Sequence, residues 1–149
     1  MVRVLALFAA VVLLAACGGH DPLDDACLSS PGAIERALAR APAAVTLPSG
    51  TRLSECVANA RSDSELQNAG LVLTRAADHL SDAAKRGDAT AALRLGYLVG
   101  AARRGAARTA GIHAELQRRI ERTAAFVDAG GPSVLAALAR GMRAGEARG

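Results

Sequence analysis

Large side chains are scarce in this sequence. Only 2% of its 149 residues are aromatic and tryptophan is missing, although 51% are hydrophobic, with alanine the commonest of these. Small side chains fill little volume, so a core of this composition requires backbones that approach closely. Alanine, leucine and arginine are good helix formers. We therefore expect an all-α fold, a small bundle of four to five helices.

Motifs of catalysis are also missing. The chain has no Gly-x-Ser-x-Gly elbow, no glycine loop for phosphate and no Glu-x-x-His pair of the di-iron kind. We therefore predict no catalytic residue, no metal and no cofactor, and a protein that is not an enzyme. A hydrolase or metal-dependent enzyme whose site is assembled from distant residues is the alternative. His79 or His113 converging with two acids would favour it.

The N-terminus carries the most specific motif. Arg3 precedes an apolar run over 4–14, and Leu14-Ala15-Ala16-Cys17 closes it. This pattern is typical of a signal peptide, and the run is too short to span a bilayer. The last four residues resemble the lipobox of bacterial lipoprotein precursors. The resemblance implies that residues 1–16 are removed and that Cys17 receives acyl chains such as palmitate.

Acylation at Cys17 would fix the location of the protein. Two or more acyl chains give stable membrane anchoring, so we expect an extracytoplasmic protein held on the cell membrane. Gly18, rather than aspartate, follows the cysteine, which allows the outer membrane where a cell has one. Residues 17–26 are glycine-rich and acidic and predict a lipidated tether, and residues 27–149 are one domain's length.

Cys27 and Cys56 are the remaining cysteines. An even pair in an exported chain predicts a disulfide, which would pin the N-terminal segment and restrict the unfolded chain by roughly 3–4 kcal/mol. A redox thiol and a metal site are the alternatives. The first lacks a Cys-x-x-Cys spacing and the second lacks companion ligands.

Apolar periodicity and capping residues predict the helices. Ser30-Pro31 opens a short helix over 31–41. Residues 45–53 alternate around Pro-Ser-Gly, which is compatible with a small β-hairpin or an irregular loop. Further helices are expected from a cap at Ser62 or Ser64 to residue 86, then over 89–109, 112–128 and 134–144, and the tail from residue 145 should fray.

Two internal similarities involve the helix predicted over 89–109. Ala91-Ala92-Leu93-x-x-Gly96-x-x-x-Gly100 is echoed 45 residues later by the segment 136–145, through either a duplicated hairpin or chance. The segment 83–100, with Gly87-Asp88 and Leu95-Gly96-Tyr97, resembles one unit of tetratricopeptide-like repeats. That resemblance implies partner binding, but it covers under thirty residues, and stacked repeats need about three units.

Basic charge gathers in the second half of the chain, where residues 100–149 hold nine arginines and four acids, a net charge of 9 − 4 = +5. We expect a non-catalytic envelope binding or structural protein whose partner is the membrane, with anionic lipid, wall polymer or an envelope protein as further candidates. Nucleic acid is excluded because no aromatics are interleaved for base stacking. The candidate contact surface consists of Arg103, Arg104, Arg108, Arg118, Arg119 and Arg122. The alternative is that these arginines only keep an alanine-rich bundle soluble.

Overall fold

The computed structural model describes residues 22–149 except 110 and 112. Within this part every regular element is a helix, which confirms the all-α fold. Six α-helices are present, where the sequence predicted four to five. The elements in chain order are the 3₁₀ helix η2 (Asp25–Leu28), α1 (Pro31–Leu38), α2 (Leu53–Ala58), α3 (Asp63–Lys85), α4 (Ala89–Ala106), α5 (Ala114–Ala124), the 3₁₀ helix η3 (Val127–Gly130) and α6 (Pro132–Arg148).

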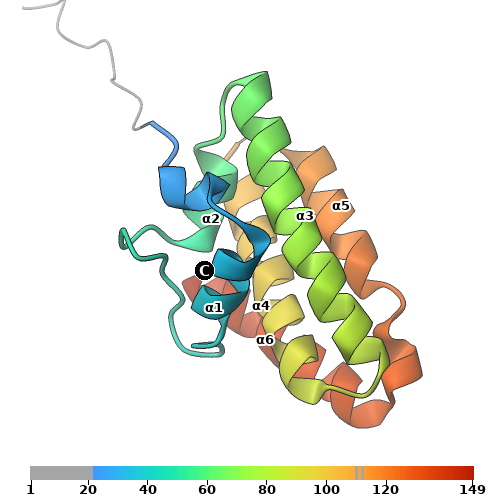
Figure 1. The fold of residues 1–149 in the computed structure, drawn as a ribbon. Coiled ribbons are helices and arrows are strands. Elements are labelled where there is room, and N and C mark those ends of the chain that lie inside the picture. Colours follow the sequence, from blue (N-terminus) through green and yellow to red (C-terminus); the bar gives the residue numbers. More distant parts are fainter. Residues whose placement is uncertain (1–21, 110, 112) are drawn as a thin grey trace, which may run out of the picture.

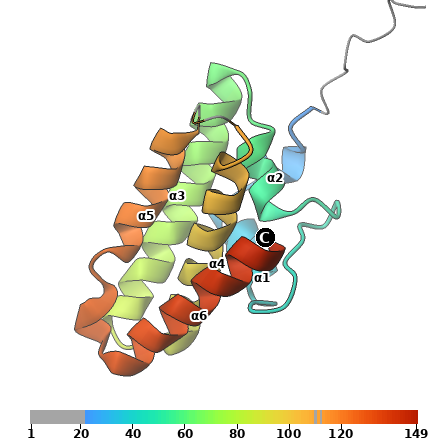
Figure 2. The same ribbon diagram turned by 180° about the vertical axis from the view of Figure 1, so that it is seen from behind.

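Helix α4 is the centre of the bundle. It packs against each of the other five α-helices, and from Leu95 to Ala102 every residue is buried. Figure 1 shows α3 and α5 running along one side of α4, with η2, α1 and α2 beside them, and Figure 2 shows α6 crossing α4 from the other side. The core is therefore centred on α4, which the other α-helices surround.

Helix α3 begins and ends where the sequence signals predicted. The Ser62 hydroxyl accepts a hydrogen bond from the Glu65 backbone, and the Glu65 carboxylate accepts one from the Ser62 backbone. This reciprocal cap satisfies two backbone donors that a helix start leaves open. Gly87 follows the helix with φ +97°, a conformation that stops it. Asp88 then caps α4 by accepting from the backbone of Thr90.

The contact between α4 and α6 is made of backbone. A Cβ placed on Gly96 would lie 2.1 Å from the carbonyl oxygen of Leu138, and one on Gly141 would lie 2.0 Å from that of Leu93. Neither position has room for any side chain. Glycines at four-residue spacing let two helices approach this closely, so the shortage of large side chains is offset by direct contact between helix backbones.

The two halves of this contact are related by the 45-residue offset seen in the sequence. Gly96 meets Leu138, and adding 45 to 96 while subtracting 45 from 138 gives the second contact, Gly141 with Leu93. Gly100 with Met142 corresponds in the same way to Gly145 with Tyr97. The repeated segments are therefore partners in one pseudo-symmetric pair of helices that run in the same direction.

The predicted disulfide is present. Cys27 in η2 and Cys56 in α2 are bonded, with their Cα atoms 5.5 Å apart and both side chains fully buried. Between them, residues 45–53 form one antiparallel bridge, Thr46 with Arg52, rather than a two-stranded hairpin. The chain turns helical at Leu53, directly after the bridge. This short helix, α2, is one that the sequence analysis did not predict.

Several helix ends differ from the expected ones. Helix α1 stops at Leu38, before the predicted residue 41, α4 stops at Ala106, before residue 109, and α5 stops at Ala124, before residue 128. Helix α6 continues to Arg148, so the prediction that the tail from residue 145 frays was wrong. The physical reason is that Gly145 packs against the carbonyl of Tyr97, which holds the last turns of α6 on α4.

The packed residues start inside the range assigned to the tether. Leu23 is 8% exposed and belongs to the core, and Asp24 caps η2 by accepting from the backbone of Ala26. The predicted signal peptide over 1–16 and the predicted lipidation site Cys17 lie outside the described residues. Among residues that the structure does describe, no helix combines the length and the hydropathy needed to cross a bilayer.

Replacing Gly141 with alanine tests the role of the close helix contact. The new methyl group would overlap the Leu93 carbonyl, so we expect the free energy of unfolding to fall by about 1–3 kcal/mol, measured by urea denaturation. Gly32→Ala in α1 is the control, because its Cβ would meet only the tip of Arg36 at 3.5 Å. Equal stability of the two variants would contradict a packing role for the glycines.

Candidate functional site

Arg103 joins three helices and is not free to bind a partner. From the last turn of α4 its Nε donates to Glu121 of α5 at 2.6 Å, and its Nη1 donates to Glu146 of α6 at 3.0 Å. The hydrogen bond with Glu121 is the main cause that raises the pKa of the guanidinium. This candidate therefore has a structural role that the sequence could not reveal, because its partners are distant in the chain.

Arg104 is also used within the fold. Its Nη1 donates to the backbone carbonyls of Glu146 and Ala147, at 2.9 and 2.8 Å. The last carbonyls of a helix have no partner inside the helix, and a cation there also complements the helix dipole. Arg104 thus caps the end of α6.

The other four candidates are exposed. Arg118 and Arg119 share one carboxylate, that of Glu115, at 2.9 and 3.1 Å. Hydrogen bonds from Arg118 and then Arg119 lower the pKa of Glu115. Arg108 and Arg122 form no ion pair with the described residues. The structure thus separates the six arginines into two that hold helices together and four that lie at the surface, three of them on α5.

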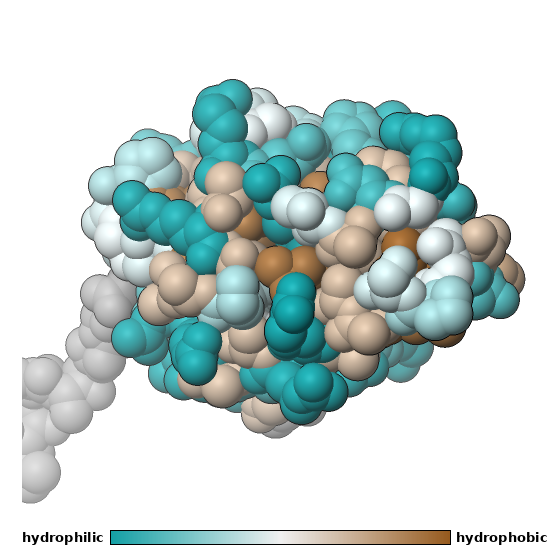
Figure 3. All heavy atoms as spheres, turned by 90° about the horizontal axis from the view of Figure 1, so that it is seen from below, coloured by the Kyte–Doolittle hydropathy of each residue, from teal (hydrophilic) through white to brown (hydrophobic). Residues whose placement is uncertain are grey.

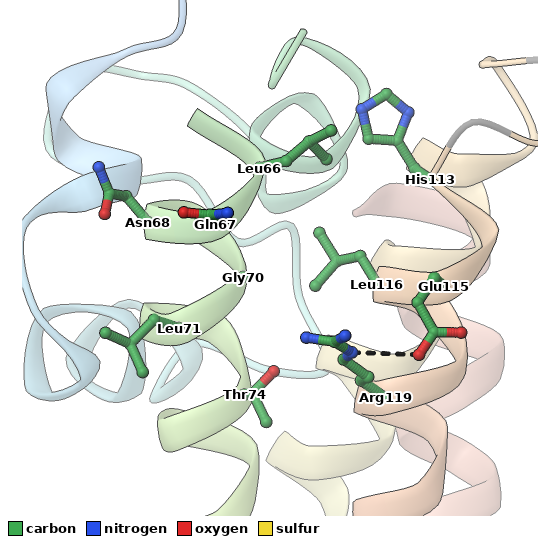
Figure 4. Close-up of a pocket in the computed structure, with 10 residues that line it drawn as sticks. All are labelled: Leu66, Gln67, Asn68, Gly70, Leu71, Thr74, His113, Glu115, Leu116 and Arg119. Carbon is green, nitrogen blue, oxygen red and sulfur yellow. Dashed lines mark hydrogen bonds and ion pairs between the residues drawn. The ribbon is translucent and has the colours of Figure 1, made fainter. Parts of the chain in front are cut away.

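A groove of about 600 Å³ runs between α3 and α5, beside these arginines. Figure 4 shows Leu66 of α3 and Leu116 of α5 pointing toward one another, with Gly70 on the α3 side between them. Arg119 extends across the groove toward α3. The walls and floor are formed by Leu66, Gln67, Asn68, Gly70, Leu71, Thr74, His113, Glu115, Leu116 and Arg119.

The sequence analysis missed this groove. Leu71 is 58% exposed, so a leucine that follows the apolar stripe of α3 is a rim residue instead of a core residue. A Cβ on Gly70 would already touch Leu116 at 3.3 Å, which shows that α3 and α5 are in contact below the groove. One signal was available in the sequence, because Leu71, next to Gly70, lies on a helix face that is otherwise polar.

Neither His79 nor His113 converges with two acids among the described residues. His113 is 3% exposed, and its Nε2 contacts the carbonyl oxygen of Ala60 while its Nδ1 has no hydrogen-bond partner. His79 is at the surface, with Nδ1 2.9 Å from one carboxylate, that of Glu35. Across the described part of the chain, no three histidine, cysteine or acidic side chains gather in a way that could hold a metal ion.

The start of the described chain lies in an acidic corner. Asp24, Asp25 and Glu55 line a depression together with Leu23. Hydrogen bonds from Ser49, and after it from Thr51, lower the pKa of Asp24, so this carboxylate is charged at neutral pH. The acidic first part of the sequence thus becomes a local negative surface beside the point where residues 1–21 attach.

Exposed apolar side chains do not form a large surface patch. Besides Leu71, only Phe126 and Leu135 are large, apolar and exposed in the described residues. Figure 3, a view of the lower end of the bundle, shows hydrophilic side chains interspersed with small apolar ones. A broad hydrophobic interface of the kind that marks an obligate partner is not visible on this face.

The comparisons with known proteins add no family. No family model, no curated protein and no solved structure matches the chain. Its class is accordingly defined by the fold alone, a disulfide-linked helical bundle around one central helix.

The ion pairs of Arg103 with Glu121 and Glu146, called the Arg103 cluster below, predict how the stability of the fold changes in acid. Burial raises the pKa of Glu121, but hydrogen bonds from Arg103 and Gln117 outweigh this and leave the pKa below its usual value of 4.5. A carboxyl group whose pKa is lower in the folded than in the unfolded state stabilises the fold above the unfolded value, and this contribution is lost as the pH falls through the folded value.

We therefore expect Arg103→Gln to reduce the loss of stability below about pH 4.5. At neutral pH it should cost at most about 1 kcal/mol, because the guanidinium is partly exposed. Urea denaturation across the acid range measures both effects. Arg108→Gln is the control with the same change of charge and should keep the acid dependence. If Arg103→Gln kept the same dependence of stability on pH as Arg108→Gln, the Arg103 cluster would not contribute to acid stability.

Proposed function

We propose that this protein is a lipid-anchored extracytoplasmic protein that binds or organises an envelope component without catalysis. The observation that carries the proposal is the sequence Leu14-Ala15-Ala16-Cys17 after an apolar run. The Cys27–Cys56 disulfide supports it independently, since such bonds persist in oxidising compartments and are rare in the cytosol.

The folded part would lie close to the membrane. Leu23 is the first described residue of the core, six positions after Cys17. A fully extended chain spans about 3.3 Å per residue, so the tether reaches at most ~20 Å. A tether this short lets the domain approach the bilayer to within about 8 Å, the distance over which its charges act on the lipid before salt screens them.

Charge favours α5 as the face that contacts an acidic partner. Arg118, Arg119 and Arg122 lie on this helix with Glu115, whereas the corner at Leu23 is acidic. Each basic residue near an anionic bilayer is worth about 1 kcal/mol. Anionic lipid is the partner favoured by the short tether, and an acidic wall polymer or an envelope protein would be recognised by the same charges.

Intact mass spectrometry of the protein purified from membranes tests the anchoring. We expect a chain that starts at Cys17 and carries the mass of a diacylglyceryl group, because acylation at the lipobox cysteine precedes cleavage in lipoproteins. Cys17→Ser should abolish the added mass and release the protein from the membrane fraction. A species that retains Met1, or one that starts at Cys17 without fatty mass, would contradict the proposal.

Hydrogen exchange of the full chain in lipid nanodiscs tests the contact face. We expect the amides of α5 to be better protected in anionic than in zwitterionic lipid, and Arg118→Gln/Arg122→Gln to remove the difference. Arg140→Gln/Arg143→Gln, on exposed positions of α6, is the matched control with the same charge change. Loss of protection in both variants would show that net charge, and not α5, is responsible.

A further inference from the structure

The groove between α3 and α5 differs from the rest of the surface because it combines an apolar floor with an exposed arginine, Arg119, at its rim. Leu116 is 7% exposed at the floor. Arg119 uses its Nε for Glu115, while its two Nη atoms have no partner among the described residues and point across the groove in Figure 4. Two Nη groups in a plane suit a carboxylate, which they can bind through both oxygens.

The shape of the groove selects a chain rather than a broad partner. It extends from Leu66 to Thr74 along α3, a rise of about 12 Å at 1.5 Å per residue. Helices α3 and α5 touch below it at Gly70 and Leu116, so the groove is narrow at its base. A flat bilayer surface does not reach such a recessed floor, whereas a single alkyl chain does.

The rim of the groove offers polar groups to a head group at one end. Glu115 pairs with the Nε of Arg119 and also with Arg118, which lies outside the groove, so the Nη atoms of Arg119 stay available. Thr74 lies opposite Arg119 in Figure 4 and carries a hydroxyl that can donate to the same head group. At the other end, the buried ring of His113 closes the groove beyond Leu66 and Leu116.

We propose that this groove binds a medium-chain fatty acid, with the carboxylate at Arg119 and the alkyl chain along Leu66, Gly70 and Leu116 toward His113. The groove volume of about 600 Å³ falls in the range of small-molecule sites. The site is independent of acylation at Cys17, so it adds a ligand to the protein whether or not the anchoring holds.

Photoaffinity labelling of the full chain in zwitterionic nanodiscs tests the site. The probe is dodecanoic acid with a diazirine at the end of the chain, and cross-linked peptides are mapped by mass spectrometry. We expect labelling near Leu66 and Leu116 that unlabelled dodecanoate competes away. Labelling spread over the whole surface, labelling that does not saturate, or equal labelling by the methyl ester of the probe would overturn the proposal.

Two neighbouring arginines provide the matched pair of variants. Arg119→Gln removes the cation in the groove, and we expect labelling to fall about tenfold, as for the loss of a hydrogen bond to a charged group. Arg118→Gln removes an arginine with the same Glu115 partner that does not line the groove, and it should label like the original chain. Arg119→Lys should retain most of the labelling.

The variants also distinguish a specific site from a charge effect or from misfolding. Far-ultraviolet circular dichroism should be unchanged in all three, because both arginines are more than half exposed. Equal loss of labelling in Arg118→Gln and Arg119→Gln would overturn the site. The membrane fraction and the intact mass are separate measurements, so failure here leaves the anchoring at Cys17 standing.

Discussion

The close contact between α4 and α6 is the constraint on which the bundle depends. Because glycines replace side chains at the crossing, the carbonyls of Leu93 and Leu138 lie where Cβ atoms would otherwise stand. Attraction between atoms falls steeply with separation, so two backbones in contact gain many favourable pairs without large residues. Helix α4 touches every other α-helix, and an error in its position would therefore disturb all of them.

The N-terminal third packs Ile34, Leu38 and Val45 into the core, and covalent and polar contacts add to this packing. The Cys27–Cys56 bond ties η2 to α2. The Tyr97 hydroxyl accepts a hydrogen bond from the backbone of Val45 at 3.0 Å in the interior. Tyr97 thus holds the irregular segment that precedes the Thr46–Arg52 β-bridge against the central helix α4. Its neighbour in the sequence, Gly96, brings α4 into contact with α6.

The parts of this structure that local signals encode could be read from the sequence, and the parts that depend on distant neighbours could not. Capping at Ser62 and Asp88 fixed the starts of α3 and α4, and two cysteines sufficed for the disulfide. Helix α2 was missed because six residues are too few to show a period. The roles of Arg103 and Arg104 depend on the last turns of α6, 42 and 43 residues away, and the groove depends on how closely α5 approaches Gly70. The 45-residue echo was visible, but only the contacts show that its two copies face each other.

The distribution of arginines shows why net charge in a sequence is a poor map of a binding surface. The basic second half supplies Arg103 and Arg104 at the end of α4, where the carboxylate and carbonyls of α6 take them up. Positive charge stays available at the surface only where arginines outnumber the acidic side chains beside them, as around Glu115. Since the chain enters the fold at an acidic corner beside Leu23, any negatively charged surface near that entry repels the corner and attracts α5. The fold thus contains an electrical asymmetry between the acidic corner and α5, and this asymmetry arises from which arginines the helix ends leave unpaired.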